Sequence, residues 1–269
     1  MTPHDFTFLK DLIYKRSGLV MSQEKVYLLE TRLIPLARLR KLSGLDELIT
    51  KARAGNDETL LRQVTEAMTT NETFFFRDTK PFDQFKKVVL PQLLKERAGR
   101  KTLRIWSAAC STGQEAYSLA MILKEAGATI DGWRIDIVGT DLASNVLEKA
   151  RVGLYSQFEV QRGLPVQLMM KYFTRNNETW QINTALRAMV KFEELNLLKD
   201  FSHLRQFDVV FCRNVLIYFD PPTKGDVLQR IRKLMPLDGS LFLGGAETVI
   251  GVTDAFKPVA NHRGLYQPT

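Results

Sequence analysis

The chain has 269 residues, of which 45% are hydrophobic and 25% are charged, and its formal net charge is +8. These proportions are ordinary for a globular protein with a buried core, and they exclude a chain that is mainly disordered. The length fits one large domain, or a small domain joined to a medium one. A positive surface favours an acidic partner, but charge alone does not choose between nucleic acid, anionic lipid and an acidic protein.

The first residues, MTPHDFTFLKDLIYKRSG, lack the basic stretch followed by an apolar stretch that marks a secretory signal. The apolar run 207–216 is shorter than the roughly 20 residues that span a bilayer. We therefore expect a cytoplasmic protein. Its two cysteines, Cys110 and Cys212, are too few for a metal cluster, and we expect both to be buried as small apolar residues.

The first hundred residues carry helical patterns and no strand pattern. Thr2 before Pro is typical of a helix start, and Gly18 can end that helix. Ser22 is expected to cap a second helix. Two shorter helices are expected near 46–54 and 56–68.

After about residue 100, short strands alternate with helices, which predicts a parallel, doubly wound α/β sheet. The expected strands lie at 103–106, 135–139, 207–212 and 239–244. The alternation lapses between about 152 and 192. There the runs 180–183 and 188–192 are expected to form a small β hairpin.

The residues that follow the strands are candidates for a ligand site, because open α/β sheets bind ligands outside the carboxyl ends of their strands. The small residues at 107–113, SAACSTG, allow a ligand to approach the backbone, although a tight structural turn is an equally good interpretation. The absence of G-x-G-x-x-G disfavours a dinucleotide. Asp141 ends the second strand, where a carboxylate either accepts the hydroxyls of an adenosine ribose or caps the next helix; the position favours the ribose.

Two further segments stand out. The stretch 213–220, RNVLIYFD, follows the third strand without the D/N-P-P-Y/F motif of nucleic acid amino-methyltransferases; Tyr218 can donate a hydrogen bond to an oxygen nucleophile or simply pack at the strand end. Upstream, 69–78 (TTNETFFFRD) has three consecutive Phe, which cannot all face one core. We expect this segment to lie between two surfaces with Arg77 near a charged group, an interdomain joint being the alternative.

Together these segments resemble the chemotaxis receptor methyltransferase (CheR) family, whose members add methyl esters to glutamates of bacterial chemoreceptors. The matching segments, found along nearly the whole chain, are 69–78, 104–120, 140–151, 194–198 and 207–220. The resemblance implies a class I S-adenosylmethionine-dependent methyltransferase with a Rossmann-like α/β sheet. It also implies a helical receptor-recognition domain at 1–70, a catalytic domain at 71–269 and a β-subdomain insert at about 152–192.

The resemblance also assigns roles residue by residue. Arg77 and Tyr218 are expected nearest the transferred methyl group. A glutamate acceptor, with an unperturbed pKa of about 4.3, is already ionised at neutral pH, so alignment of the reactants is expected to suffice without a strong base. The expected cofactor contacts are Asn71, Thr73, Arg77, Ala108, Glu115, Asp141, Asn196, Leu197, Arg213 and Asn214.

A basic run on the second helix, Arg32, Arg38, Arg40 and Lys41, is by itself usually a solvated face. In this family a basic helix is expected to meet the acidic methylation helices of the receptor. The insert around 174–184 is short, so we expect independence from a C-terminal receptor pentapeptide. The resemblance places the protein in the cytoplasm at receptor arrays on the inner face of the membrane, with no membrane insertion, nucleic acid partner or metal.

Three other functions compete with this one. An RNA methyltransferase predicts aromatic residues interleaved with Lys and Arg, or a binding module, and neither is evident. A cofactor sensor without catalysis predicts loss of Arg77, Asp141 or Tyr218, and all three are present. The missing glycine fingerprint disfavours a nicotinamide oxidoreductase.

Overall fold

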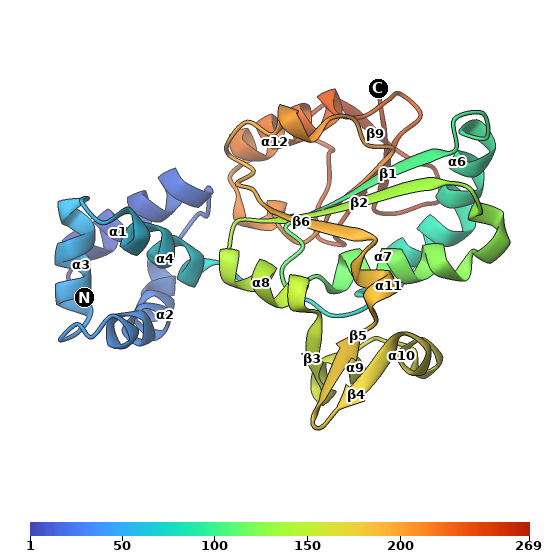
Figure 1. Cartoon of the computed structure of the whole chain (residues 1–269). Coiled ribbons are helices and arrows are strands. Elements are labelled where there is room, and N and C mark those ends of the chain that lie inside the picture. Colours follow the sequence, from blue (N-terminus) through green and yellow to red (C-terminus); the bar gives the residue numbers. More distant parts are fainter.

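A computed structural model describes residues 1–269 as a small helical domain beside a larger α/β domain (Figure 1). The helical domain comprises α1 (Pro3–Ser17), α2 (Val26–Leu39), α3 (Leu45–Ala54) and α4 (Glu58–Met68). Thr2 caps α1 in a capping box with Asp5, and the left-handed Gly18 ends it, as predicted. Ser22 instead precedes a 3-10 turn, η1 (Gln23–Lys25), so α2 begins later than predicted. The four helices bury a separate apolar core.

The α/β domain is built on a seven-stranded sheet with the order β6-β2-β1-β7-β8-β10-β9. The first five strands in this order are parallel, and β10 pairs antiparallel with both of its neighbours, β8 and β9. The strands are β1 (Thr102–Ala108), β2 (Arg134–Asp141), β6 (Val190–Glu194), β7 (Val209–Cys212), β8 (Ser240–Leu243), β9 (Phe256–Pro258) and β10 (Leu265–Pro268). All four predicted strands are therefore present in one parallel array.

Helices cover both faces of this sheet, as the doubly wound prediction requires. Side chains alternate along β7: Val209 and Phe211 enter the core on one face, and Val210 and Cys212 enter the core on the other. The first core also contains residues of α7 (Gln114–Glu125), and the second contains residues of α12 (Pro221–Lys233). The remaining covering elements are α5 (Lys80–Gln84), η2 (Phe85–Val89), α6 (Leu90–Glu96), α8 (Ser144–Val152) and α11 (Thr184–Arg187).

A three-stranded antiparallel sheet with the order β3-β5-β4 projects from the main sheet (Figure 1). It comprises β3 (Leu154–Ser156), β4 (Phe173–Asn176) and β5 (Thr179–Ile182), with α9 (Gln157–Gln161) and α10 (Val166–Tyr172) beside them. The predicted hairpin between 180–183 and 188–192 is wrong: β5 pairs with β3 and β4, whereas β6 pairs in parallel with β2 at the edge of the main sheet. An edge strand is only half covered, so its V-K-F alternation suits either kind of sheet.

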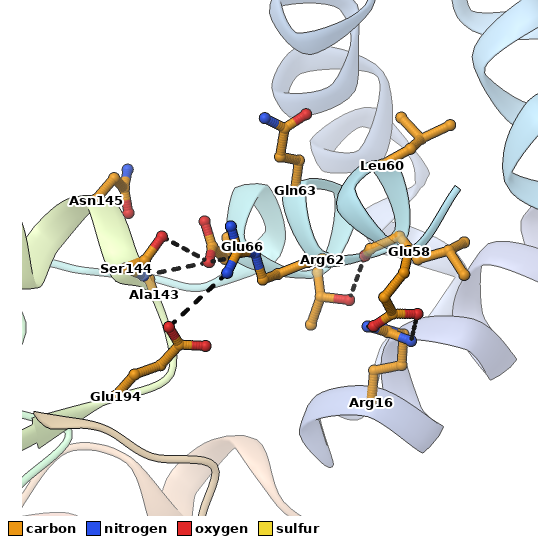
Figure 2. Close-up of polar contacts among 12 residues, drawn as sticks. Arg16, Glu58, Leu60, Arg62, Gln63, Glu66, Ala143, Ser144, Asn145 and Glu194 are labelled. Carbon is orange, nitrogen blue, oxygen red and sulfur yellow. Dashed lines mark hydrogen bonds and ion pairs between the residues drawn. The ribbon is translucent and has the colours of Figure 1, made fainter. Parts of the chain in front are cut away.

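The two domains meet through a polar interface, shown in Figure 2. Glu66 of α4 accepts hydrogen bonds from the backbone N–H of Ser144 (3.2 Å) and from its hydroxyl (3.1 Å), at the first turn of α8. Arg62 lies between Glu66 (3.8 Å) and Glu194 (3.9 Å). Nearby, the Asn196 amide donates to the backbone oxygen of Arg16 (2.6 Å).

No helix of the structure has the length and apolar character that crossing a bilayer requires. Cys110 and Cys212 are both buried and unpaired, as predicted.

Candidate functional site

A pocket lies at the carboxyl ends of β1, β2 and β7, where the loops that follow these parallel strands begin. Its volume, open mouth included, is about 910 Å³. The helical domain contributes Ser17 and Leu19 to the lining, and the linker between the domains contributes 69–73 and Arg77. The site is therefore built by both domains.

All but one of the predicted catalytic and cofactor-contact residues line this pocket. Ala108 does not: it is fully buried in the last position of β1, and its side chain enters the core on the α12 face. Ala109, one residue later, lines the pocket in its place. The predicted residues in the lining are Asn71, Thr73, Arg77, Glu115, Asp141, Asn196, Leu197, Arg213, Asn214 and Tyr218.

The turn after β1 has an unusual backbone. Ala109 (φ 54°) and Ser111 (φ 52°) are left-handed although neither is glycine, and such strain gathers at ligand-binding turns. Gly113 (φ 91°) is required sterically as well, since a Cβ there would lie 2.9 Å from the Cβ of Ala150. The turn therefore brings the chain close to β2 and sends the N–H of Ser111 toward Asp141.

Asp141 is the most deeply buried carboxylate of the pocket lining, with 6% of its surface exposed. It accepts the backbone N–H of Ser111 (2.8 Å) and of Ala143 (2.9 Å), one on each oxygen. Burial raises the pKa of Asp141 above its ordinary value, although these N–H groups act in the opposite direction. The N-cap position of α8 is Ala143, and Asp141 binds the N–H of this residue and none within the helix. Each carboxylate oxygen can accept one further hydrogen bond.

Glu115 and Arg213 form a second buried polar group. Ser107 donates to Glu115 (2.8 Å), and Arg213 Nη1 donates to the other Glu115 oxygen (2.8 Å). Arg213 Nη2 donates to Asp78 (2.6 Å) and to the backbone oxygen of Arg77 (2.9 Å). The Arg213 side chain is 1% exposed, yet its Nε has no acceptor. A buried donor without an acceptor in a pocket wall fits a site that binds an anionic group.

The linker segment 69–78 joins the two domains and also forms one wall of the pocket. The interdomain joint and the segment between two surfaces are therefore not exclusive alternatives. Phe75 is fully buried, whereas the Phe74 ring lies near the guanidinium groups of Arg77 (5.7 Å) and Arg162 (4.4 Å). Arg77 Nη1 donates to the backbone oxygen of Glu72 (2.6 Å), and Arg162 pairs with the Glu72 carboxylate (2.5 Å). Arg77 is thus held by Glu72 and Phe74 of the same segment.

Tyr218 is half-buried at the end of η5 (Leu216–Tyr218), and its backbone oxygen accepts the N–H of Val20 from the helical domain (2.9 Å).

The sequence analysis did not predict Glu247, whose carboxylate holds the loop that carries Tyr218. Glu247 follows β8, the strand after β7. Its position beyond the carboxyl end of a parallel strand was the one signal available.

The four predicted docking cations do not share one free face. Arg32 Nη1 donates to the backbone oxygens of Met68 (2.7 Å) and Thr69 (3.0 Å), which ties α2 to the linker. Arg40 donates to Gln63 (2.7 Å) and pairs with Asp57 (2.6 Å) on the neighbouring helix. The remaining two, Arg38 and Lys41, are exposed.

Two family models match consecutive parts of the chain. The CheR methyltransferase all-alpha domain matches residues 4–69, and the CheR methyltransferase SAM-binding domain matches residues 71–265. The chain belongs to the CheR methyltransferase family. It is accordingly an S-adenosylmethionine-dependent methyltransferase of the chemotaxis type, with a helical domain packed on a methyltransferase fold.

Relatives agree along nearly the full length. Chemotaxis protein methyltransferase 1 of Pseudomonas aeruginosa is 40% identical over 97% of this chain and 96% of its own. Chemotaxis protein methyltransferase Cher2 of Pseudomonas putida is 37% identical over the same shares. Among solved structures, PKMT2 from Rickettsia typhi has a TM-score of 0.39 at 16% identity, over 65% of this chain and 26% of that one, a likeness too distant to bear on function.

The residues of the pocket fit the cofactor of this family. S-adenosylmethionine carries ribose hydroxyls, an ammonium and a carboxylate. The pocket offers complementary groups for each: the buried carboxylate of Asp141 and that of Glu115, and the unpaired N–H of Arg213.

Proposed function

We propose that this CheR methyltransferase transfers a methyl group from S-adenosylmethionine to glutamate side-chain carboxylates of chemoreceptors, forming methyl esters. The names of the relatives, chemotaxis protein methyltransferases, support a substrate in the chemotaxis pathway. The observation that carries the proposal is the chemistry of the pocket: Tyr218 and Arg77 line the same pocket as the other proposed cofactor contacts, and none of the three His residues lines it. Such a site suits an acceptor that needs no deprotonation.

The bound cofactor supplies an electrophilic methyl group on a positively charged sulfur. The glutamate carboxylate is ionised at neutral pH, so it would accept the methyl group without prior deprotonation, with S-adenosylhomocysteine as the second product. Tyr218 donates a hydrogen bond that holds the carboxylate, and Arg77, fixed through Glu72 and Phe74, orients it. The rate gain then comes from alignment, for which effective molarities are large.

The helical domain is proposed to recognise the receptor. Of the predicted docking cations, Arg38 of α2 and Lys41 just after its end remain free to meet an acidic helix, and Tyr27 (63%) and Leu39 (76%) of α2 are also exposed. We also propose that no C-terminal pentapeptide of the receptor is needed, since only Asn177 and Glu178 connect β4 to β5. The place of action would be the cytoplasmic face of receptor arrays.

The test is incubation of the chain with labelled S-adenosylmethionine and receptor cytoplasmic fragments. We expect label on the fragments that mild base releases, because carboxyl methyl esters hydrolyse readily. Tyr218→Phe should lower kcat at least about tenfold, the cost of one hydrogen bond to a charged group. Base-stable label, label on RNA instead, or full activity of Tyr218→Phe would contradict the proposal or the assigned role.

A further inference from the structure

Glu247 lies in the loop after β8, behind the pocket wall, and 9% of its surface is exposed. Its carboxylate accepts four backbone N–H groups and no side-chain donor. One oxygen binds Gly244 (2.6 Å) and Asn214 (2.8 Å), and the other binds Val215 (2.9 Å) and Ile217 (3.3 Å). Two acceptor bonds on each oxygen match the capacity of an ionised carboxylate.

Three of these four N–H groups belong to the loop that leaves β7. Within that loop Asn214 is left-handed (φ 59°), a conformation that is uncommon for residues other than glycine and that Asn adopts more readily than most. Asn214, Val215 and Tyr218 all line the pocket. Glu247 therefore sets the backbone from which the proposed cofactor and acceptor contacts extend.

Gly244 provides further evidence, because the Glu247 carboxylate and the Asn214 loop approach its backbone so closely that no side chain fits there. A Cβ at this position would lie 2.7 Å from Oε2 of Glu247 and 2.9 Å from the side-chain nitrogen of Asn214. Any side chain at 244 would therefore push the carboxylate and the Asn214 loop apart.

We propose that Glu247 is a positioning residue for methyl transfer: its carboxylate holds the loop 214–217 so that Asn214 meets the cofactor and Tyr218 meets the acceptor. The part that concerns Tyr218 rests on the proposed function. Glu247 itself does not line the pocket, so it acts through the loop and not by contact with either substrate.

The test compares Glu247→Gln and Gly244→Ala with Asp208→Asn. The first replaces one acceptor oxygen by a donor, and the second keeps the carboxylate but fills the space it needs. Asp208 is the matched control: it is a buried carboxylate at the opposite end of β7, where it accepts Arg97 Nε (2.9 Å) and the Arg104 N–H (2.9 Å). The readouts are calorimetric affinity for S-adenosylhomocysteine, kcat with receptor fragments, and the thermal midpoint.

We expect both loop variants to weaken S-adenosylhomocysteine binding about tenfold and to lower kcat about thirtyfold, as loss of hydrogen bonds to a charged group predicts. Asp208→Asn should lower the thermal midpoint but leave affinity and kcat within about twofold. If Glu247→Gln does not fold, Gly244→Ala decides the matter.

Wild-type affinity and kcat in both loop variants, or an equal loss in Asp208→Asn, would overturn the inference. If the wild-type chain leaves receptor fragments unmethylated, the proposed function fails, whereas the affinity for S-adenosylhomocysteine still tests the role of Glu247.

Discussion

At the scale of single residues, Asp141 combines deep burial with a proposed contact to the ribose. Burial raises its pKa, because a low-dielectric surrounding disfavours the charged form. The ionised carboxylate is the better acceptor for two hydroxyl groups. We therefore expect affinity for S-adenosylhomocysteine to fall as the pH is lowered, and the fall to begin at a higher pH than for an ordinary aspartate.

Asp141→Asn should bind S-adenosylhomocysteine at least about tenfold more weakly at neutral pH and lose most of this acid dependence. Calorimetric titrations across the acid range measure both effects. Asp220→Asn is the control: hydrogen bonds from Thr223 and Tyr14 lower the pKa of Asp220, and it caps α12 outside the pocket. An unchanged pH profile in Asp141→Asn, or a flattened one in Asp220→Asn, would refute the assignment.

At the scale of elements, α8 begins without a cap of its own. Its N-cap residue is Ala143, which has no side-chain acceptor, and the carboxylate of Glu66 from α4 binds the first N–H instead. An anion at a helix N-terminus also interacts favourably with the helix dipole. Because α8 directly follows Asp141 in the chain, this contact connects the helical domain to the pocket.

Glu66→Ala is expected to destabilise the protein by about 1 kcal/mol, the usual cost of losing an N-cap. It should also weaken S-adenosylhomocysteine binding, because the start of α8 supports the Asp141 loop. Glu58→Ala on the same helix is the matched control, since Glu58 is largely exposed and pairs only with Arg16 of its own domain. Thermal unfolding and calorimetry of the two variants distinguish a contact that connects the two domains from a surface ion pair. Equal losses of stability and of affinity in both variants would argue against the proposed role of Glu66.

At the scale of the whole molecule, the proposed receptor surface lies on the helical domain, at the opposite end from α6 (Figure 1). Charge reversal at Arg38 and Lys41 should raise KM for receptor fragments about tenfold at low salt with kcat unchanged, and the difference should shrink as salt is added. Lys86→Glu with Lys95→Glu changes the net charge equally near α6 and should leave KM within about twofold. Equal KM values for the two double variants would exclude this docking face.

Much of this architecture was accessible from local patterns. Continuous apolar runs such as 207–212 predict buried parallel strands, and the residues after them gather at one edge because parallel strands share a direction. The prediction placed β6 in a hairpin because its apolar and polar residues alternate. Such alternation reflects burial on one face only, and an edge strand of the main sheet shows it as well as a hairpin strand does. The side chain of Ala108 enters the core, and that of Ala109 lines the pocket, because successive side chains of a strand point to opposite faces.

The sequence by itself determined the class of fold, the order of the motifs and ten of the residues that line the pocket, because these follow from periodicity and from where the chain leaves each strand. Only the tertiary structure decided which charged side chains remain free and which hold the molecule together. Arg32 and Arg40 look like docking cations along the helix, yet they bind the linker and a neighbouring helix. Glu66 and Glu247 stabilise segments about 80 and 30 residues away, and no local pattern encodes such partners because hydrogen bonding there depends on how the elements pack.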